Sequence, residues 1–464
     1  MKLFNKILLL IEVIASVILL YLLISMAILP NKYLMIVIAL IIVCLVISFL
    51  LTYKANKVRD IIFKIISIIF SILLLFGCIQ INNSASFIEN ISNSTTELHT
   101  ISILVLKDSD YELVEDLNDK DLGYDHNIKE EYFDEFKSSL RGEYNLIKYD
   151  DYNSLVNDLL DYKIDGLIIS DSDKLKIEDI DLDINNKTKV IYSYNIEEEV
   201  LNIKNEDSLD DGIFNICISG IDTYGDVSVK SRSDVNMLMS VNMNTNQILL
   251  TSIPRDYYVT LPSYDAKDKL THAGIYGINE TIGAISNLLD VDIDYYFRIN
   301  FNSLINIVDI IGGIDVYSDT AFGSGDTYIK EGVNHMNGKM ALAFSRERYS
   351  YKEGDIHRVQ NQQAVIEAII DKLSSYEIIS NYNELLKELE GSFETNMTSK
   401  ELYSLIKKQL NDLKKYEVIK QNLTGTGSMM TGGYSMPNSN LYYMIPDENS
   451  ISDAKVLIDS VING

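Results

Sequence analysis

Three long apolar runs open the chain, separated by short polar segments. They cover about Ile7–Leu29, Tyr33–Leu51 and Ile61–Ile81. Each run is close to the length that a helix needs to cross ~30 Å of hydrocarbon. A cleaved signal peptide fits poorly, because three runs follow one another and no small-residue cleavage site is evident. The pattern therefore predicts a multi-pass membrane anchor of three helices over residues 1–81.

The cationic residues around these runs lie mostly on one side of the predicted membrane. Lys32 lies between the first two runs, whereas the other two flanking segments carry Lys2, Lys6, Lys54, Lys57 and Arg59. Because cytoplasmic segments are enriched in Lys and Arg, we expect a cytoplasmic N-terminus and an extracytoplasmic body after the third run. Glu12 lies inside the first run. It is either an intramembrane functional group or, as we favour, near the interface or against a neighbouring helix.

Beyond the anchor, short strand patterns alternate with helical ones. Residues 82–98 are rich in Ser and Asn and predict a tether. Strand patterns follow at 99–106, 143–149, 165–170 and 188–194, with helical spacing over 152–163. This alternation predicts a small α/β accessory domain over 99–201 with a largely parallel sheet. Because it lacks a glycine-rich phosphate loop, a His cluster and a nucleophile constellation, we interpret it as a recognition or accessory unit.

A polar, charged linker over 202–212 leads into the last domain, residues 213–464. Buried-strand patterns occupy 213–222, 248–253, 257–261 and 295–301, and helical patterns occupy 279–290, 301–315 and 357–373. Gly312 and Gly313 end the second of these helices, as glycine commonly does. The predicted fold class is therefore α/β, with a mixed α/β domain whose helices pack on a central sheet.

The chain is strongly acidic, with a formal net charge of −27. Residues 1–81 have a net charge of +5, which leaves −32 for the rest. Such a body is a poor nucleic-acid binder, because that affinity depends on cationic neutralisation of phosphates. The three cysteines, Cys44, Cys78 and Cys217, have neither metal-site spacing nor an obvious disulfide partner. Composition thus excludes nucleic acid as a partner and gives no sign of a cysteine metal site.

Against this acidic background, arginines gather at predicted strand ends and helix starts of the last domain. They are Arg232, Arg255, Arg346, Arg348 and Arg358, and Asp222, Asp234 and Asp355 occupy similar positions. Arginine's planar fork suits phosphate oxygens, and carboxylates beside bound phosphates are ready ligands for Mg²⁺. These residues favour a phosphate or pyrophosphate site, although each arginine alone also fits a surface ion pair of little energetic worth.

Arg255 shows the choice most clearly. It follows Pro254 between two strand patterns in "ILLTSIPRDYYVTL", residues 248–261. One interpretation is a turn with a local ion pair, since proline begins turns well. The other is a strand end that directs Arg255 toward a ligand.

Several stretches between residues 213 and 375 carry a family pattern in both order and spacing. They include "SGIDTYG", "KSRSDVNMLMSVN", "LLTSIPRDYYV", "GVNHMNGKMALAFSRERY" and "GDIHRVQNQQAVI", and "YYMIPDENSISDAKVLIDSVING" closes the chain. Together they resemble the LytR-CpsA-Psr family of membrane-anchored phosphotransferases, with three spans and an upstream α/β unit in the CpsA-type arrangement. The resemblance implies Mg²⁺-dependent transfer of an anionic or secondary cell-wall glycopolymer from an undecaprenyl-diphosphate carrier to peptidoglycan.

The same resemblance implies a role for each site residue. Asp222 and Asp234 would hold Mg²⁺, and Asp234, Arg255 and Asp355 would carry the catalysis. The diphosphate and head group would contact Arg232, Arg255, Arg346, Arg348, Arg358, Gln362 and Lys269.

Three further residues complete these expectations. His272 is expected to pack locally and Asp256 to orient its loop. The family usually reads Arg-x-x-Arg-Gln where this chain has "RVQNQ". Asn361 therefore replaces an arginine, which is expected to weaken or retune head-group binding.

Two other functions fit the same residues. The site would hydrolyse diphosphates if water were the acceptor, or the chain would act as a non-catalytic, lipid-diphosphate-binding scaffold or sensor of cell-wall assembly. The intact acids and arginines argue against the sensor, and Asn361 argues slightly for it. For the lipid, an apolar groove is expected from Val365, Ile366, Ile369, Ile370 and helix 301–311, unless these residues are ordinary core.

Overall fold

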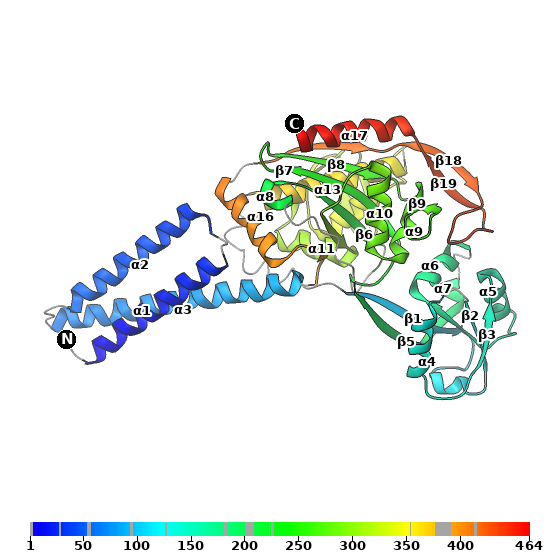
Figure 1. Ribbon diagram of the computed structural model, residues 1–464, viewed down its shortest axis with the longest axis horizontal. Helices are drawn as coiled ribbons and strands as arrows, with labels where there is room; N and C mark the ends of the chain where they lie inside the picture. Colours follow the sequence, from blue (N-terminus) through cyan, green and yellow to red (C-terminus); the bar gives the residue numbers. More distant parts are fainter. Residues whose placement is uncertain are drawn as a thin grey trace.

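Three apolar helices form a bundle that projects from one side of the molecule (Figure 1). In the computed structural model they are α1 (Leu3–Ser25), α2 (Asn31–Thr52) and α3 (Lys57–Ser92). Within the described residues, these three helices are long and apolar enough to cross a membrane. The structure describes residues 3–26, 29–52, 57–92, 96–125, 128–180, 184–199, 208–221, 223, 227–352, 354–375, 391–412 and 415–464.

Polar side chains of the bundle lie inside it and apolar side chains lie on its outer surface, as expected for helices surrounded by lipid. Leu10, Val43 and Phe76 point outward and are more than half exposed. Glu12 is fully buried and accepts a hydrogen bond from Ser48 of α2 at 3.2 Å. Glu12 therefore lies against a neighbouring helix, as favoured from the sequence.

The residues predicted as a tether, 82–98, are largely regular structure. Helix α3 continues to Ser92, and β1 begins at Thr96. The anchor therefore leads into the accessory unit with residues 93–95 between helix and strand, and these three lie outside the described residues.

The accessory unit is built on a five-stranded sheet of order β3-β2-β4-β1-β5 among its described strands. Its elements are β1 (Thr96–Leu106), η1 (Val114–Leu117), β2 (Asp121–Asp125), α4 (Glu130–Ser139), β3 (Asn145–Tyr149), α5 (Tyr152–Leu160), β4 (Gly166–Ser170), α6 (Asp171–Ile180), α7 (Ile184–Lys187) and β5 (Thr188–Glu199). The pairings of β2 are parallel, but β1 pairs antiparallel with β4 and β5. The prediction of a largely parallel sheet holds for β2, β3 and β4 and is wrong at β1, which runs against both of its neighbours, because the chain enters along β1 and leaves along β5 on the same side.

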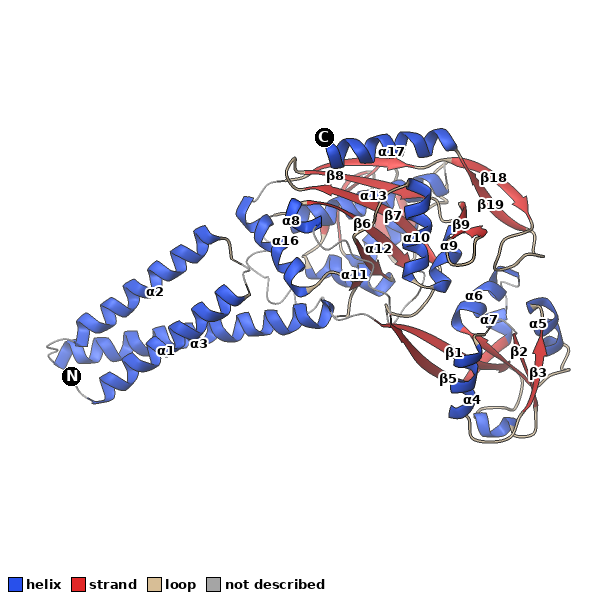
Figure 2. Cartoon of the chain, viewed as in Figure 1, coloured by secondary structure: helices blue, strands red, loops and turns tan. Residues whose placement is uncertain are grey.

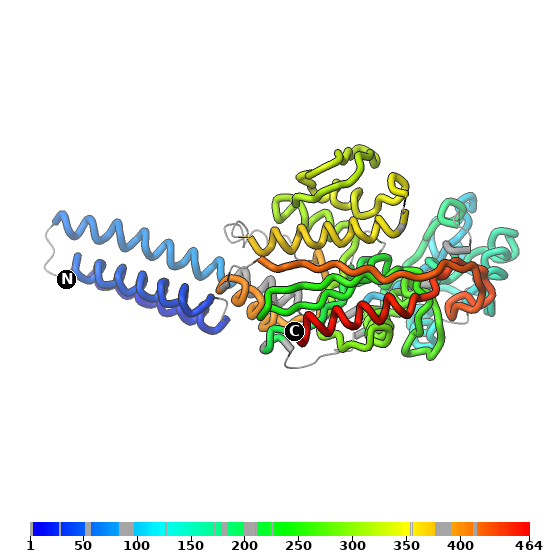
Figure 3. The backbone as a smooth tube through the Cα atoms, turned by 90° about the horizontal axis from the view of Figure 1, so that it is seen from above, coloured from blue at the N-terminus to red at the C-terminus, as the bar shows by residue number. Residues whose placement is uncertain are grey.

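The mixed domain contains a six-stranded central sheet of order β16-β11-β6-β7-β8-β17 among its described strands. These strands are β6 (Ile213–Ile221), β7 (Ser233–Asn242), β8 (Gln247–Ile253), β11 (Tyr295–Ile299), β16 (Glu394–Thr395) and β17 (Glu417–Asn422). Helices cover both faces (Figures 2 and 3): α8 (Ser208–Asp211), α10 (Ile278–Leu289), α13 (Asp355–Leu373), α16 (Ser399–Asp412) and α17 (Glu448–Asn463). The predicted α/β fold class is confirmed.

The two faces follow from alternation along each strand. Cys217 and Leu238 pack against α10 and α17, whereas Ile216, Ile218 and Met237 pack against α13 and α16. Each face therefore has its own apolar core, and the side chains that remain for function lie at the strand ends.

Smaller elements surround this sheet. Near β8 lie β9 (Tyr258–Leu261), β10 (Ala266–Lys269), α9 (Leu270–Ala273) and η2 (Gly274–Tyr276). A cap is formed by α11 (Phe301–Ile310), β12 (Ile314–Ser318), β13 (Phe322–Ser324), β14 (Thr327–Ile329), β15 (Gly332–Met336) and α12 (Gly338–Arg346). The hairpin of β18 (Gly425–Met430) and β19 (Leu441–Pro446) reaches toward the accessory unit (Figure 1).

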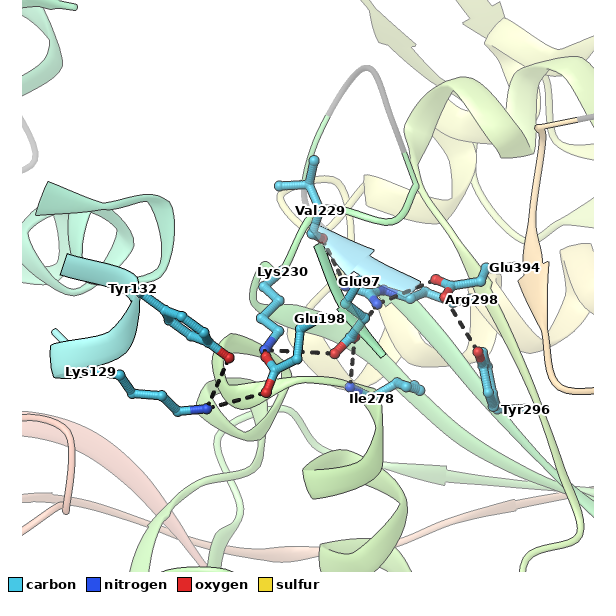
Figure 4. A network of polar contacts seen from close by, with 10 residues as sticks. All are labelled: Glu97, Lys129, Tyr132, Glu198, Val229, Lys230, Ile278, Tyr296, Arg298 and Glu394. Atoms are coloured by element: carbon cyan, nitrogen blue, oxygen red, sulfur yellow. Dashed lines mark hydrogen bonds and ion pairs between the residues drawn. The ribbon is translucent and has the colours of Figure 1, made fainter. Parts of the chain in front are cut away.

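A buried ionic network joins the accessory unit to the mixed domain (Figure 4). Arg298 of β11 is 1% exposed and contacts Glu97 of β1, Glu394 at 3.3 Å and the carbonyl oxygen of Val229 at 2.7 Å. Glu97 also accepts from the backbone N–H of Ile278 at 2.9 Å. Because a buried ion pair needs further hydrogen bonds to offset desolvation, these contacts fix how β1 meets the central sheet.

Candidate active site

Strand ends converge at one edge of the central sheet. Gly220, near the end of β6, pairs with Val235 near the start of β7 and with Ile299 at the end of β11. Beside them, Ile253 ends β8 opposite Asn236. The side chains that follow these strand ends therefore meet, and they line a cleft of about 700 Å³.

Three helices complete the cleft, each through a single stripe of side chains. Helix α12 contributes Lys339, Leu342, Ala343 and Arg346, which are spaced i, i+3, i+4 and i+7. Helix α13 contributes Arg358, Gln362, Val365 and Ile366, and α11 contributes Phe301, Leu304 and Ile305. Since residues at these spacings share a helix face, α12 and α13 present both polar and apolar members to the same space, whereas α11 presents apolar ones.

Arg255 and Asp234 meet in the lining of the cleft. Arg255 Nη1 donates to Asp234 Oδ2 at 2.7 Å, and Thr271 Oγ1 donates to Asp234 Oδ1 at 3.1 Å. The side chains of Arg255 and Asp234 are 28% and 18% exposed. Asp234 is therefore held by one partner on each oxygen while its surface remains open to the cleft.

The next arginines are positioned by neighbouring aromatic rings. The guanidinium of Arg346 lies 4.3 Å from the centre of the Phe301 ring, and Arg348 Nη2 donates to the Tyr349 hydroxyl at 2.7 Å. Both arginines line the cleft, as does Gln362. Stacking leaves the edge of a guanidinium available for an oxygen ligand, because its N–H groups lie in the plane of the fork.

Asp256 and Lys269 support the loop of Arg255. Asp256 Oδ2 lies 3.6 Å from Arg255 Nε, and its other oxygen lies 3.6 Å from Lys269 Nζ. Nearby, His272 is fully buried, and its Nδ1 lies 2.9 Å from Asp268 Oδ1. His272 therefore packs locally, as expected, and Asp256 is placed to orient its loop.

The structure brings most of the predicted site together, but not all of it. Asp234, Arg255, Arg346, Arg348, Arg358 and Gln362 line the cleft, whereas Arg232 and Lys269 do not. Asp355 begins α13, but its side chain and the whole of Asp222 lie outside the described residues. Asn361 is 3% exposed and donates to the Phe344 carbonyl oxygen at 3.1 Å, so it holds α13 against α12 and is not a cleft residue.

Comparison with known proteins decides the family. The model of the LytR_cpsA_psr family matches residues 172–455 of this chain. The chain belongs to the LytR-CpsA-Psr family. The match begins within α6, before the predicted start of the last domain at residue 213.

Individual members of the LytR-CpsA-Psr family are also similar. The polyisoprenyl-teichoic acid–peptidoglycan teichoic acid transferase TagU of Bacillus licheniformis is 32% identical over 275 residues, covering 58% of this chain and 86% of the relative. The enzyme of the same name from Bacillus subtilis is 34% identical over 243 residues, covering 52% and 75%. The crystal structure of B. subtilis TagV is 28% identical, covering 55% of this chain and 98% of its own, with a TM-score of 0.46.

Two charged residues that line the cleft, Lys339 and Glu347, are not among the site residues predicted from the sequence. Lys339 lies two helical turns before Arg346 on the same stripe of α12, and this spacing is visible in the sequence. Glu347 accepts hydrogen bonds from the backbone N–H groups of Tyr349 and Ser350 at 2.6 and 2.9 Å. Glu347 therefore shapes the turn that carries Arg348, a role without a sequence pattern.

The donor set at this family site is compatible with a hard divalent cation. Among the described residues, no group of three or more His, Cys, Asp or Glu side chains is placed to hold a metal ion. Mg²⁺ does not require such a group, because it binds one or two carboxylates and takes its other ligands from water and substrate phosphates. Asp234, which lines the cleft with one oxygen toward Arg255, fits that requirement.

Proposed function

We propose that this protein is a phosphotransferase that moves an anionic or secondary cell-wall glycopolymer from an undecaprenyl-diphosphate carrier to peptidoglycan. The observation that carries the proposal is the mixed lining of the cleft. It gathers Arg255, Arg346, Arg348 and Arg358 together with apolar side chains of α11, α12 and α13. The TagU relatives are named as teichoic acid transferases, which supports the same class of reaction.

Each kind of lining residue suits one part of the proposed carrier. Diphosphate oxygens would take forked, charge-assisted hydrogen bonds from the arginines, and Gln362 would contact the head group. The polyprenyl chain would lie along Leu304, Ile305 and Ile366. The sequence also suggests Val365, Ile369 and Ile370 for this groove, but they belong to apolar cores instead. Val365 is 2% exposed and packs with Ile369 in the core of the cap, and Ile370 packs in the core on the α13 face of the central sheet.

The reaction requires positioning and charge neutralisation more than covalent help. A hydroxyl oxygen of the acceptor sugar would attack the phosphorus atom bonded to the glycopolymer, and a new P–O bond would form. The bond from that phosphorus to the bridging oxygen would break, and undecaprenyl phosphate would leave with the electron pair. Asp234 and Asp355 are the carboxylates proposed to accept the hydroxyl proton, and the arginines would stabilise the charge on the leaving phosphate.

Asp234, together with Asp222, would hold Mg²⁺, which when bound supplies further charge neutralisation at the diphosphate. Arg255 and Thr271 each occupy one oxygen of Asp234. These contacts fix the carboxylate in one orientation before substrate arrives, which reduces the reorganisation that binding would otherwise require.

The anchor geometry supports an extracytoplasmic site. Lys32, at the start of α2, donates to the backbone carbonyl of Asn411 in α16, so this end of α2 lies beside the mixed domain. The N-terminus and the cationic start of α3 lie at the far end of the bundle (Figure 1). Because Lys and Arg are retained in the cytoplasm, the far end would be cytoplasmic and the cleft would be outside.

The proposal is tested by reconstituted transfer. Purified full-length protein in detergent is mixed with undecaprenyl-diphosphate-linked glycopolymer, peptidoglycan oligomer and Mg²⁺. The proposal expects a glycopolymer–peptidoglycan phosphodiester and one undecaprenyl phosphate per transfer. Release of free glycopolymer phosphate without adduct would instead indicate a hydrolase.

A further inference from the structure

A second pocket of about 440 Å³ lies between the accessory unit and the mixed domain. The accessory unit contributes residues of α4, α5 and the loops before them, and the mixed domain contributes the β9–β10 turn, η2 and the loop between β18 and β19. The volume is within the range of small-molecule sites. None of the residues assigned to the diphosphate cleft lines this pocket.

Aromatic rings form one wall of the interdomain pocket. Tyr264 and Tyr434 stack with centroids 4.6 Å apart, and Tyr276 tilts against Tyr264 at 4.7 Å. Tyr264 is 37% exposed and Tyr434 is 42% exposed. Partly exposed tyrosines present an apolar face and a polar tip to a ligand, and this combination suits a sugar ring, which has C–H faces and hydroxyl edges.

The cations of the pocket already have carboxylate partners. Lys176 pairs with buried Asp173 at 2.8 Å, and both Lys230 and Lys129 contact Glu198. Burial lowers the pKa of the remaining basic group, His99, to about 4, so this side chain is neutral near pH 7. An anionic ligand would therefore find little free positive charge.

The pocket lining also offers exposed polar groups that are neutral or negative. Asp150, Asp151 and Asn153 lie on the accessory side and Asn438 on the side of the mixed domain, and all are exposed. Carboxylate and amide oxygens accept hydrogen bonds from hydroxyl groups, and amide N–H groups donate to hydroxyl or acetamido oxygens. These groups complement a neutral polyhydroxylated ligand and repel an anionic one.

We propose that this interdomain pocket binds a neutral glycan segment, and that the glycan is the peptidoglycan acceptor strand. The acceptor role rests on the proposed function, whereas binding of the glycan does not. Lys230 lines the interdomain pocket and Asp234 lines the diphosphate cleft. Four residues of extended chain span at most about 14 Å, so a glycan held in the pocket lies within a short oligosaccharide of the cleft.

The probe for binding is the tetramer of β-1,4-linked N-acetylglucosamine, titrated calorimetrically into the full chain in detergent. We expect saturable binding at one site. Tyr264→Ala combined with Tyr434→Ala should weaken it on the order of tenfold, because two stacking faces are lost. Asn438→Trp, on an exposed loop, should block the pocket without touching the core. The matched control is Tyr317→Ala, which removes a ring that is 61% exposed on β12.

The outcomes separate this inference from the proposed function. Binding that is lost in the pocket variants and kept in Tyr317→Ala and Arg255→Lys supports the pocket, even if no transfer is detected. Absence of tetramer binding, or equal binding in all variants, overturns it, even if transfer is normal. Displacement of the tetramer by inorganic pyrophosphate in the Arg255→Lys variant would also overturn it, because the pocket would then be an anion site.

The acceptor role has its own readout. In the transfer assay, Asn438→Trp should raise the KM for peptidoglycan oligomer by about tenfold while the KM for the lipid-linked donor stays constant. An equal rise in both values, or no rise in either, contradicts the acceptor assignment.

Discussion

Arg255 Nη1 donates to Asp234 Oδ2 at 2.7 Å, which joins two residues that are 21 positions apart in the sequence. The sequence allows two interpretations of Arg255, a turn ion pair or a ligand contact. The structure shows an ion pair that crosses from the end of β8 to the start of β7, inside the cleft. The neighbouring Asp256 lies farther away, at 3.6 Å. Arg255 therefore orients a cleft carboxylate and also faces the space proposed for the diphosphate.

Arg255→Lys tests whether the forked guanidinium matters. Lysine keeps the charge and can still pair with Asp234, but it cannot reproduce two parallel hydrogen bonds to phosphate. A lost charge-assisted hydrogen bond is worth roughly 1.5–3 kcal/mol, so turnover or lipid affinity should fall on the order of tenfold to a hundredfold. Melting temperature should barely change. The control is Arg141→Lys, at an exposed position of the accessory unit. Full transfer activity in Arg255→Lys would mean that Arg255 serves only as an ion-pair partner of Asp234.

Asp234→Asn tests the metal assignment. The amide oxygen can still accept from Arg255 and the amide N–H can donate to the Thr271 hydroxyl, but the side chain carries no charge to hold Mg²⁺. Mg²⁺-dependent turnover should fall to background, and a higher Mg²⁺ concentration should not restore it fully. Circular dichroism and thermal melting serve as the fold control. An unchanged Mg²⁺ titration curve in the variant would remove Asp234 from the metal site.

Arg298→Met tests the junction between the accessory unit and the mixed domain. The substitution leaves Glu97 and Glu394 buried without their cation, and breaking such a pair costs about 3–5 kcal/mol. The free energy of unfolding should fall by that order, as measured by denaturant titration. Arg141→Met, which removes an exposed arginine, should change it little. Equal stability of the two variants would mean that the buried network does not hold the junction.

The orientation of the anchor is tested by thiol labelling in intact cells. Met429→Cys, at a position 59% exposed on β18, should react with an impermeant reagent, whereas Val58→Cys, 64% exposed at the start of α3, should not. The parent chain gives the background, since Cys217 is buried and Cys44 and Cys78 lie within the apolar helices. Protection of the Met429→Cys variant together with labelling of the Val58→Cys variant would show that the topology is the opposite of the one proposed.

Local periodicity predicts most of the secondary structure, because burial on one face leaves a readable pattern. The strand predicted over 213–222 is β6, and the helix predicted over 357–373 is α13. The direction in which two strands pair is harder to predict, because the pattern of one strand does not show which other strand lies beside it in the sheet. The prediction for the accessory sheet is therefore wrong at β1, whose antiparallel partners come from distant parts of the chain.

The site is predictable where chemistry lies at strand ends, and less so elsewhere. Asp234 and Arg255 follow that rule and line the cleft. Arg298 does not follow this rule. In the sequence, the arginine of "YYFRINF" resembles an outward-facing strand residue, and its ion pair with Glu97 of the accessory unit is visible only in the structure. Asn361 stands where the family usually has arginine, and only the structure reveals that its side chain binds the Phe344 carbonyl oxygen.

A product assay with doubly labelled donor is the sharpest test of glycopolymer transfer through the cleft. The donor carries one label on the glycopolymer and another on the polyprenyl chain. With wild-type protein, Mg²⁺ and peptidoglycan oligomer, the account predicts that the glycopolymer label joins peptidoglycan by a phosphodiester while the lipid label is recovered as undecaprenyl phosphate. Both events should be lost together in Asp234→Asn. Lipid release without attachment of the glycopolymer, or attachment that persists in Asp234→Asn, would contradict it.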